Sequence, residues 1–325
     1  MKTVDSITLI AKNEAMREML RRLDKIVDSD SSVLLIGETG VGKEIIAEYI
    51  HRTSPRSQKP FVKIGLSAMP ADLLESELFG HEKGSYTSAS QEKKGLFEIA
   101  NSGSLFLDDI DDVPIPIQTK LLRVLESREM MRIGGTKPIP IDVRLITASK
   151  VDLKELVAKK IFRDDLFYRI NVVPVTIPPL RERRDDIPPL IKHFLKYYRP
   201  EEEITLTNEA IRALVSYSWP GNVRELRNVV QRLTLYSNGK IKIEDLPPEI
   251  RNENPVEFLL KACSKCYVDG KLQFGQIVKC LESNLLQEAL KKSNGNQTKA
   301  AKSLGLSLST FRDKLKKYDL FCSQK

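Results

Sequence analysis

The 325-residue sequence contains no apolar run approaching the roughly 18 residues that suggest a membrane-spanning helix. Its start, MKTVDSITLIAKNE, also lacks the long apolar core and small-residue cleavage site of a secretory signal peptide. These absences exclude a spanning helix and predict a cytoplasmic protein without a membrane partner. Apolar residues make up 41% of the chain and charged residues 30%, which allows two or three domains with cores of their own.

Cysteine and histidine are scarce, with four and three residues respectively. All the cysteines lie after residue 260, and one pair, Cys263 and Cys266, has C-x-x-C spacing. A zinc site would require a second close pair of ligands, and the histidines all lie before residue 200. We therefore expect ordinary reduced cysteines, with a metal or redox role for this pair as the alternative.

Positive charge is concentrated near the C-terminus. Residues 288–325 contain nine Lys or Arg and three Asp or Glu, which gives +6 of the chain's formal net charge of +8. Such a basic block indicates nucleic acid as a partner, with a solvated basic surface as the alternative.

The segment VLLIGETGVGKE, residues 33–44, has the layout of a strand, a glycine-rich loop and a helix. Glycines let several backbone N–H groups converge, and the helix adds its positive end, so this P-loop pattern predicts a bound polyphosphate such as ATP. An ordinary glycine turn is the alternative. Glu44 occupies the usual Ser/Thr position, so Mg²⁺ must find its ligands elsewhere. The expected nucleotide contacts are Gly37, Glu38, Thr39, Gly40, Val41, Gly42, Lys43 and Glu44.

The rest of the first half predicts an α/β fold with a parallel sheet and helices on both faces. Apolar patterns indicate further strands at residues 61–64, 104–110 and 143–148, and helices at 14–27 and 118–126. The strand at 104–110 delivers Asp108 and Asp109 at its C-terminal end, where such sheets place their ligands. After Pro174 the chain becomes rich in turns and charge, and residues 187–235 predict a small helical domain.

The C-terminal residues predict a helix-turn-helix. Leu285, Leu286, Ala289 and Leu290 form one apolar helix face, residues 297–304 a second helix, and Ser307 or Ser309 can cap a third that runs through Lys317. A basic helical hairpin without a DNA role is the alternative. The third helix would enter the major groove, where the candidate base readers are Ser307, Ser309, Thr310 and Arg312 and the candidate phosphate contacts are Lys314, Lys316 and Lys317.

Six motifs occur in a fixed order: GETGVGKE, ESELFGHEKG, LFLDDID, FRDDLFYRINVVP, PPLRERRDDI and WPGNVREL. Together they resemble the AAA+ domain of bacterial enhancer-binding proteins, the NtrC-like activators of sigma-54 RNA polymerase. The segment GNQTKAAKSLGLSLSTFRDKLKKY resembles their Fis-type helix-turn-helix. The resemblance implies an α/β ATPase subdomain at 1–173, a helical lid at 174–250, a linker at 251–275 and a DNA-binding domain at 276–325. No regulatory domain is expected before the ATPase.

The resemblance also implies a ring, usually a hexamer, with ATP at the protomer interfaces and dimers on DNA. Lys43 would bind the phosphates, Asp108 would hold Mg²⁺ through water, and Asp109 would activate the attacking water. Arg224 matches the second sensor of the nucleotide. Arg163 and Arg169 match arginines that reach the neighbour's ATP, and local ion pairs with Asp164 or Asp165 are the alternative for them.

Several positions depart from the family pattern. The sigma-contacting loop comprises Gly84, Ser85, Tyr86, Thr87, Ser88 and Ala89, and it keeps the aromatic residue and the threonine but has serine in place of an alanine and a glycine. Around hydrolysis, Asp109 replaces glutamate, Gly65 replaces the asparagine that contacts that glutamate, and Ser149 with Lys150 replaces the Thr–Asn of the first sensor.

Two functional hypotheses follow. The first is an ATP-dependent activator of sigma-54 promoters. The second is a DNA-binding regulator, including a repressor or a sigma-54-independent one, in which ATP controls assembly while hydrolysis or sigma-54 contact is weak. An AAA+ unfoldase or replication loader is a more distant alternative.

Overall fold

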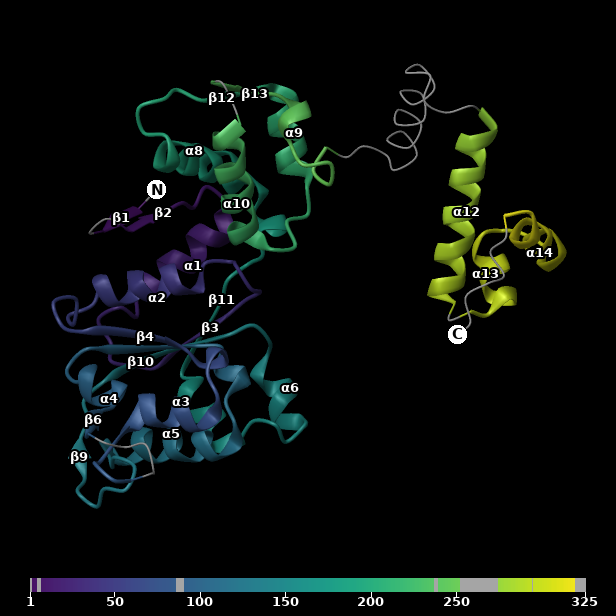
Figure 1. The fold of residues 1–325 in the computed structure, drawn as a ribbon. Helices are drawn as coiled ribbons and strands as arrows, with labels where there is room; N and C mark the ends of the chain where they lie inside the picture. The colour runs from purple at the N-terminus through teal and green to yellow at the C-terminus, as the bar shows by residue number, and fades with distance from the viewer. Residues whose placement is uncertain are drawn as a thin grey trace. The chain divides into compact units, whose positions relative to one another are not determined.

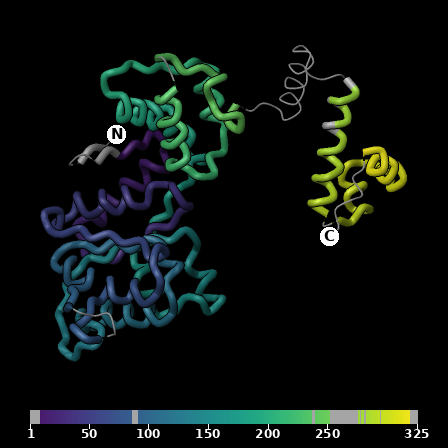
Figure 2. The backbone as a smooth tube through the Cα atoms, viewed as in Figure 1, coloured from purple at the N-terminus to yellow at the C-terminus, as the bar shows by residue number. Residues whose placement is uncertain are grey.

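The computed structural model describes residues 2–4, 7–85, 91–236, 239–251, 274–293 and 295–318. The chain divides into two compact units, residues 1–251 and 252–325 (Figure 1, Figure 2). Within the described residues, no helix is long and apolar enough to cross a membrane. Most of the predicted linker, including Cys263 and Cys266, lies outside the described residues.

A five-stranded parallel sheet organises the first unit. Its strand order is β11-β3-β10-β7-β4. Strand β3, which precedes the P-loop, therefore lies between β11 and β10. The strands are β3 (Val33–Ile36), β4 (Phe61–Gly65), β7 (Ser104–Asp108), β10 (Arg144–Ser149) and β11 (Val173–Thr176).

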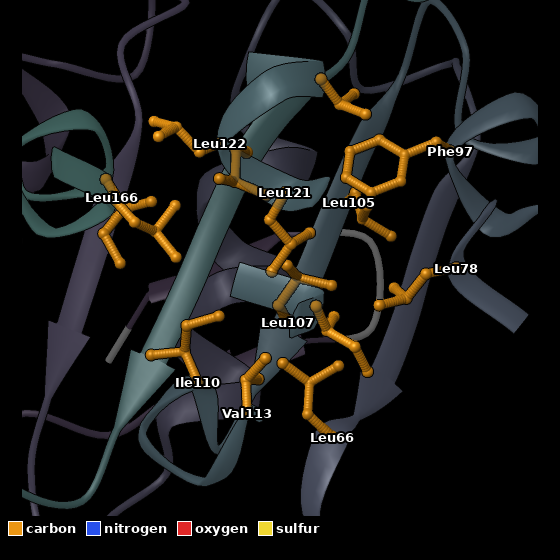
Figure 3. Packing of buried hydrophobic residues seen from close by; sticks show 14 of the residues in the cluster. Leu66, Leu78, Phe97, Leu105, Leu107, Ile110, Val113, Leu121, Leu122 and Leu166 are labelled. Carbon is orange, nitrogen blue, oxygen red and sulfur yellow. The ribbon is translucent and has the colours of Figure 1, made fainter. Parts of the chain in front are cut away.

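Helices cover both faces of this sheet, as Figure 1 shows. Alternate residues of a strand point to opposite faces, so Leu34 and Leu105 join one core whereas Leu35 and Phe106 join the other. The second core packs against α1 (Glu14–Asp24) and α2 (Lys43–Arg52). The first packs against α3 (Ala71–Phe79), α4 (Leu96–Ile99), α5 (Ile115–Ser127), α6 (Leu153–Ala158) and α7 (Asp164–Ile170), and Figure 3 shows its centre, where Leu107, Ile110 and Leu121 meet.

Three predicted elements have a boundary that differs by more than one residue from the observed one. The first helix ends at Asp24, and the carbonyls of Ile26 and Val27 beyond it accept hydrogen bonds from the buried guanidinium of Arg144. The strand predicted at 104–110 ends at Asp108 because Asp109 has a φ of 56°, which no extended strand accommodates. The helix predicted at 118–126 begins earlier, at Ile115.

The predicted helical lid follows the sheet in the same unit. Its three helices pack around the fully buried Trp219, whose indole N–H donates to the carbonyl oxygen of Leu214 at 2.8 Å. The lid elements are η3 (Leu180–Glu182), η4 (Arg184–Asp186), α8 (Ile187–Tyr198), β12 (Thr205–Leu206), α9 (Asn208–Ser216), α10 (Asn222–Tyr236), β13 (Lys240–Ile241) and η5 (Ile243–Asp245).

Short elements complete the first unit. They include two 3-10 turns beside the sheet, η1 (Leu66–Ala68) and η2 (Ile110–Asp112). They also include three antiparallel pairs, β1 (Lys2–Val4) with β2 (Ile7–Leu9), β5 (Gly80–His81) with β6 (Lys93–Lys94), and β8 (Glu129–Met130) with β9 (Ile139–Pro140).

In the second unit, residues 274–293 and 295–318 form a cluster of three helices, α12 (Phe274–Lys292), α13 (Gln297–Ser303) and α14 (Leu308–Lys317). Ala300 and Ala301 of α13 are buried and lie close to Phe311 and Leu315 of α14. Of the two serines predicted as possible caps, Ser307 is the N-cap, since its Oγ accepts the backbone N–H of Thr310 at 3.1 Å.

Candidate functional site: a nucleotide cleft and a DNA-binding helix

The P-loop follows β3 and ends at the first turn of α2. Gly40 and Gly42 have φ angles of 80° and 107°, a left-handed conformation that favours glycine. The side chain of Lys43 lies largely buried across the loop, and its Nζ donates to the carbonyl oxygens of Gly37 at 2.8 Å and Glu38 at 3.4 Å. Burial lowers the pKa of Lys43, while nearby Asp108 and Asp109 act in the opposite direction. A polyphosphate in the loop would supply the anionic partner that this ammonium lacks.

Asp108 is the last residue of β7 and Asp109 follows it, at the same edge of the sheet as the P-loop. They line one cleft of about 310 Å³ together with Lys43 and, from the lid, Arg224. Burial and the charge of Asp109 raise the pKa of Asp108. Besides these four residues, Glu44, Lys150 and Arg227 line the cleft. Its cationic side chains fit a phosphate chain, and its carboxylates fit a hard cation, because Mg²⁺ takes oxygen ligands.

The lid contacts the P-loop backbone directly. The carbonyl oxygen of Gly40 accepts from the N–H of Val223 at 3.0 Å, and the amide nitrogen of Asn222 donates to the carbonyl oxygen of Thr39 at 3.1 Å. A Cβ at Gly40 would lie 2.4 Å from the carbonyl oxygen of Gly221, so glycine is required there for this close approach as well as for its φ. These contacts hold the first turn of α10 against the P-loop, and Arg224 of that turn lines the cleft.

Glu38 belongs to the P-loop, but its carboxylate binds the lid. Arg181 donates to both carboxylate oxygens, at 2.6 and 2.8 Å, and the Asn222 amide donates at 3.1 Å. These hydrogen bonds lower the pKa of Glu38 to about 2. Asn222 is fully buried with a φ of 53°, and its Oδ1 accepts the N–H of Leu180, so it joins three segments of the chain.

The carboxylate of Asp109 has a hydrogen-bond partner, although Gly65 replaces the asparagine that the family pattern places against it. Ser67, in the 3-10 turn after β4, donates its hydroxyl to Asp109 Oδ2 at 2.6 Å. Because Gly65 pairs with Asp108 in the β4–β7 register, the turn that follows brings Ser67 to Asp109. In the sequence, the only sign of this contact is the hydroxyl of Ser67, two residues after Gly65.

The first-sensor position is also rearranged. The hydroxyl of Ser149 donates to the carbonyl oxygen of Val151 at 2.7 Å, and the Lys150 ammonium pairs with Asp112 at 2.6 Å and Asp111 at 3.5 Å. Lys150 lines the nucleotide cleft, so this chain adds a second ammonium where an uncharged amide was expected.

Arg163 and Arg169 do not line this cleft. Arg163 binds Asp165 through two hydrogen bonds of 2.7 and 3.0 Å. This is the local ion pair predicted from the sequence as the alternative for Arg163. Arg169 donates to the carbonyl oxygen of Leu125 and lines a separate cavity beside Ser32 and Val172, which precede β3 and β11. That cavity therefore lies at the amino edge of the parallel sheet, opposite the P-loop.

Only the base of the predicted sigma-contacting loop is described; Tyr86, Thr87, Ser88 and Ala89 lie outside the described residues. Gly84 has a φ of 81°, and Ser85 follows it with its hydroxyl buried. Arg132, from the 129–140 hairpin, binds the segments on both sides of the loop through Glu82 at 3.2 Å and Glu92 at 3.5 Å, and it also binds Glu98 at 2.9 Å. Sequence reasoning missed this cation, which fixes the base of the loop to the hairpin.

The predicted DNA contacts gather on α14 and its cap. At its start the hydroxyl of Ser307 hydrogen-bonds to those of Ser309 and Thr310. Arg312 Nε donates to the side-chain oxygen of Gln297. Lys316 and Lys317 are exposed, as expected for phosphate contacts.

Lys314 differs from the other two lysines. It pairs with Glu282 of α12 at 2.7 Å, and Tyr318 binds the same carboxylate. The contact joins α14 to α12, and it competes with the phosphate contact predicted for Lys314.

A parallel sheet with a P-loop, paired acids at the end of a nearby strand and a helical lid that carries an arginine defines a P-loop NTPase of the AAA+ type. A separate helix-turn-helix unit accompanies it. Residues 9–176 match the family described as the sigma-54 interaction domain, 181–261 the AAA+ ATPase lid domain and 278–318 the bacterial regulatory proteins of the Fis family. The chain belongs to the sigma-54 interaction family. It is a nucleotide-binding, sigma-54-dependent DNA-binding transcriptional activator, with DNA and sigma-54 as partners.

Named relatives agree with this assignment. The chain is 42% identical over 320 residues to the regulatory protein AtoC of Escherichia coli, covering 96% of this chain and 68% of AtoC. It is 40% identical to the DNA-binding transcriptional regulator NtrC of Rhizobium meliloti, covering 96% and 70% of the two chains. The solved structure of NtrX from Brucella abortus in complex with ADP superposes with a TM-score of 0.70 at 31% identity, over 97% of this chain and 69% of that one.

Proposed function

We propose that this chain hydrolyses ATP at the interfaces of a ring, usually a hexamer, and uses the energy to remodel sigma-54 RNA polymerase at promoters. One observation carries the proposal: Lys43, Asp108, Asp109 and Arg224 line one cleft, whereas Arg169 lies at the opposite edge of the sheet. A cation so placed cannot reach the nucleotide of its own chain. A neighbouring copy can bring it to a γ-phosphate, which would couple turnover to assembly.

Each residue in the cleft has a role in this proposal. Lys43 and the P-loop N–H groups would hold the β- and γ-phosphates, and Asp108 would hold Mg²⁺ through water. The bound Mg²⁺ would neutralise charge on the phosphate oxygens. Asp109 accepts a proton from the water whose oxygen attacks the γ-phosphorus, while the bond to the bridging oxygen breaks and ADP leaves. Arg224 from the lid, with Arg163 or Arg169 from the neighbour, stabilises the transferring group.

A second candidate is a regulator in which ATP controls assembly but turnover is weak. It is favoured by Asp109, which is one methylene shorter than glutamate, since a misplacement of about 1 Å can cost on the order of a hundredfold in rate. A Cβ at Gly65 would meet nothing within 4 Å, so asparagine fits there. If the site is weakened, the double change Gly65→Asn, Asp109→Glu should raise ATP turnover by more than the product of the single effects.

Under both candidate functions, the DNA-binding unit holds the protein at specific sites on DNA. We propose that paired copies of α14 enter successive major grooves, where Ser307, Ser309, Thr310 and Arg312 read bases while Lys316 and Lys317 bind phosphates. Loop residues 84–89, supported by Arg132, would then contact the sigma factor.

A promoter-opening assay separates the two candidates. Sigma-54 polymerase, a supercoiled promoter with binding sites for this chain, and ATP are combined, and opening is followed by permanganate reactivity of unpaired thymines. Opening with ATP and none with a non-hydrolysable analogue supports the remodelling activator. DNA binding without opening under both conditions supports the second candidate.

A further inference from the structure

The hydroxyl of Ser67 lies 2.6 Å from one oxygen of the Asp109 carboxylate. We propose that Ser67 is a positioning residue for ATP hydrolysis, which holds the short Asp109 side chain in the orientation that activates water. This inference rests on the proposed role of Asp109 as the base.

The backbone explains why the hydroxyl arrives there. Strands β4 and β7 pair in register through Gly65 and Asp108, and both strands end at this point. Beyond the pairing, β4 turns into the 3-10 turn at residues 66–68 and β7 into the left-handed residue Asp109, with a φ of 56°. The two turns lie against each other, and Leu66 anchors the first in the core shown in Figure 3. Position 67, rather than 65, therefore faces Asp109.

Ser67 has no competitor for this carboxylate in the described part of the chain. It is the one side chain there that hydrogen-bonds the Asp109 carboxylate, and it binds Oδ2 alone. Asp109 is half-buried at the cleft, so its carboxylate would otherwise rotate between orientations. A hydroxyl fixed on Oδ2 leaves Oδ1 to accept the proton of a water, which is the geometry a general base requires.

The alternative is that the hydrogen bond only stabilises the turn. Ser67 is exposed, so loss of its hydroxyl should disturb the fold little. A purely structural hydrogen bond would change melting temperature or ATP affinity, whereas a positioning bond changes the catalytic rate constant at unchanged KM.

The test uses the full chain with steady-state ATP turnover. Ser67→Ala should lower kcat about tenfold, the loss expected for one hydrogen bond to a charged group, with KM for ATP and melting temperature unchanged. Ser67→Thr, which keeps the hydroxyl, should retain at least half of native kcat. Ser127→Ala is the matched control, because Ser127 is an exposed serine whose hydroxyl contacts only backbone carbonyls and the N–H of Glu129.

A double-mutant arm separates this inference from the proposed function. Asp109→Asn should abolish turnover, and adding Ser67→Ala should then change nothing further, because the two residues act as a unit. Native-like turnover in Asp109→Asn, or none in the native protein, refutes the proposed base and the inference with it. Loss in Asp109→Asn but native kcat in Ser67→Ala overturns the inference alone, as does an equal loss in Ser67→Thr and Ser67→Ala.

Discussion

The carboxylate of Glu38 joins the P-loop to the lid, and Glu38→Gln tests whether that connection sets nucleotide affinity. Gln keeps an acceptor for the Asn222 amide but removes the negative charge that Arg181 binds with both nitrogens. Helix α10, which begins at Asn222, carries Arg224 into the cleft. A weaker connection between Glu38 and the lid should therefore leave the lid open for a larger share of the time.

The magnitude follows from the exposure of the pair. The pKa of Glu38 falls from 4.5 to about 2 through its hydrogen bonds with Arg181 and Asn222. The side chains of Glu38 and Arg181 are 42% and 41% exposed, so solvent screens the pair strongly. We therefore expect loss of the charge to raise the dissociation constant for ATP by at most about fivefold.

The assay is titration of a fluorescent ATP analogue at pH 7, with Glu182→Gln as the control. Glu182 is the neighbouring acid, and its carboxylate lies 4.0 Å from Arg181, so its loss should change affinity little. The pKa of Glu38 is depressed in the folded protein, so its contribution to stability is complete above about pH 4.5 and declines as the pH falls toward 2. Equal affinities of Glu38→Gln, Glu182→Gln and the native chain would refute the reasoning.

Three further outcomes are expected. Lys43→Ala should abolish binding of the same analogue with circular dichroism unchanged, because the ammonium bonds only to loop carbonyls in the folded chain; native affinity would contradict the P-loop assignment. Arg163→Ala protein mixed with Lys43→Ala protein should regain ATPase activity, since some interfaces then pair an intact cleft with an intact arginine; no regain at any mixing ratio would oppose sharing between subunits. In gel-shift titrations, Arg312→Ala should lose sequence preference, whereas removing Lys316 and Lys317 should weaken binding to all sequences and flatten its salt dependence.

The parts of the site that sequence predicts are local ones. The P-loop could be predicted because its strand, glycines and lysine lie within twelve consecutive residues, and Asp108 and Asp109 because they end a buried strand. The AAA+ fold and the Fis-type helix-turn-helix follow from motifs of the same kind.

The missed contacts join residues far apart in sequence. Ser67 meets Asp109 across 42 residues, and Asn222 meets Glu38 across 184. Each of these contacts depends on a strand register or on a residue with positive φ. Neither feature can be predicted from residue type alone. Arg163 illustrates the reverse case, since its pairing with Asp165 two residues away was foreseen as an alternative.

The Arg163–Asp165 pair bears on how assembly could control turnover. Within one chain the Arg163 side chain is 37% exposed, and its guanidinium binds the Asp165 carboxylate and the Thr119 hydroxyl. Paired in this way, it carries little net charge toward a distant anion. For Arg163 to stabilise a neighbour's γ-phosphate, it must exchange or share Asp165, and a phosphate with two or more negative charges is the stronger competitor. Such an arginine acts on ATP only when a neighbouring subunit brings its bound ATP close to the guanidinium. A chain with this pairing should therefore turn over ATP in proportion to assembled interfaces, and turnover per chain should rise with protein concentration.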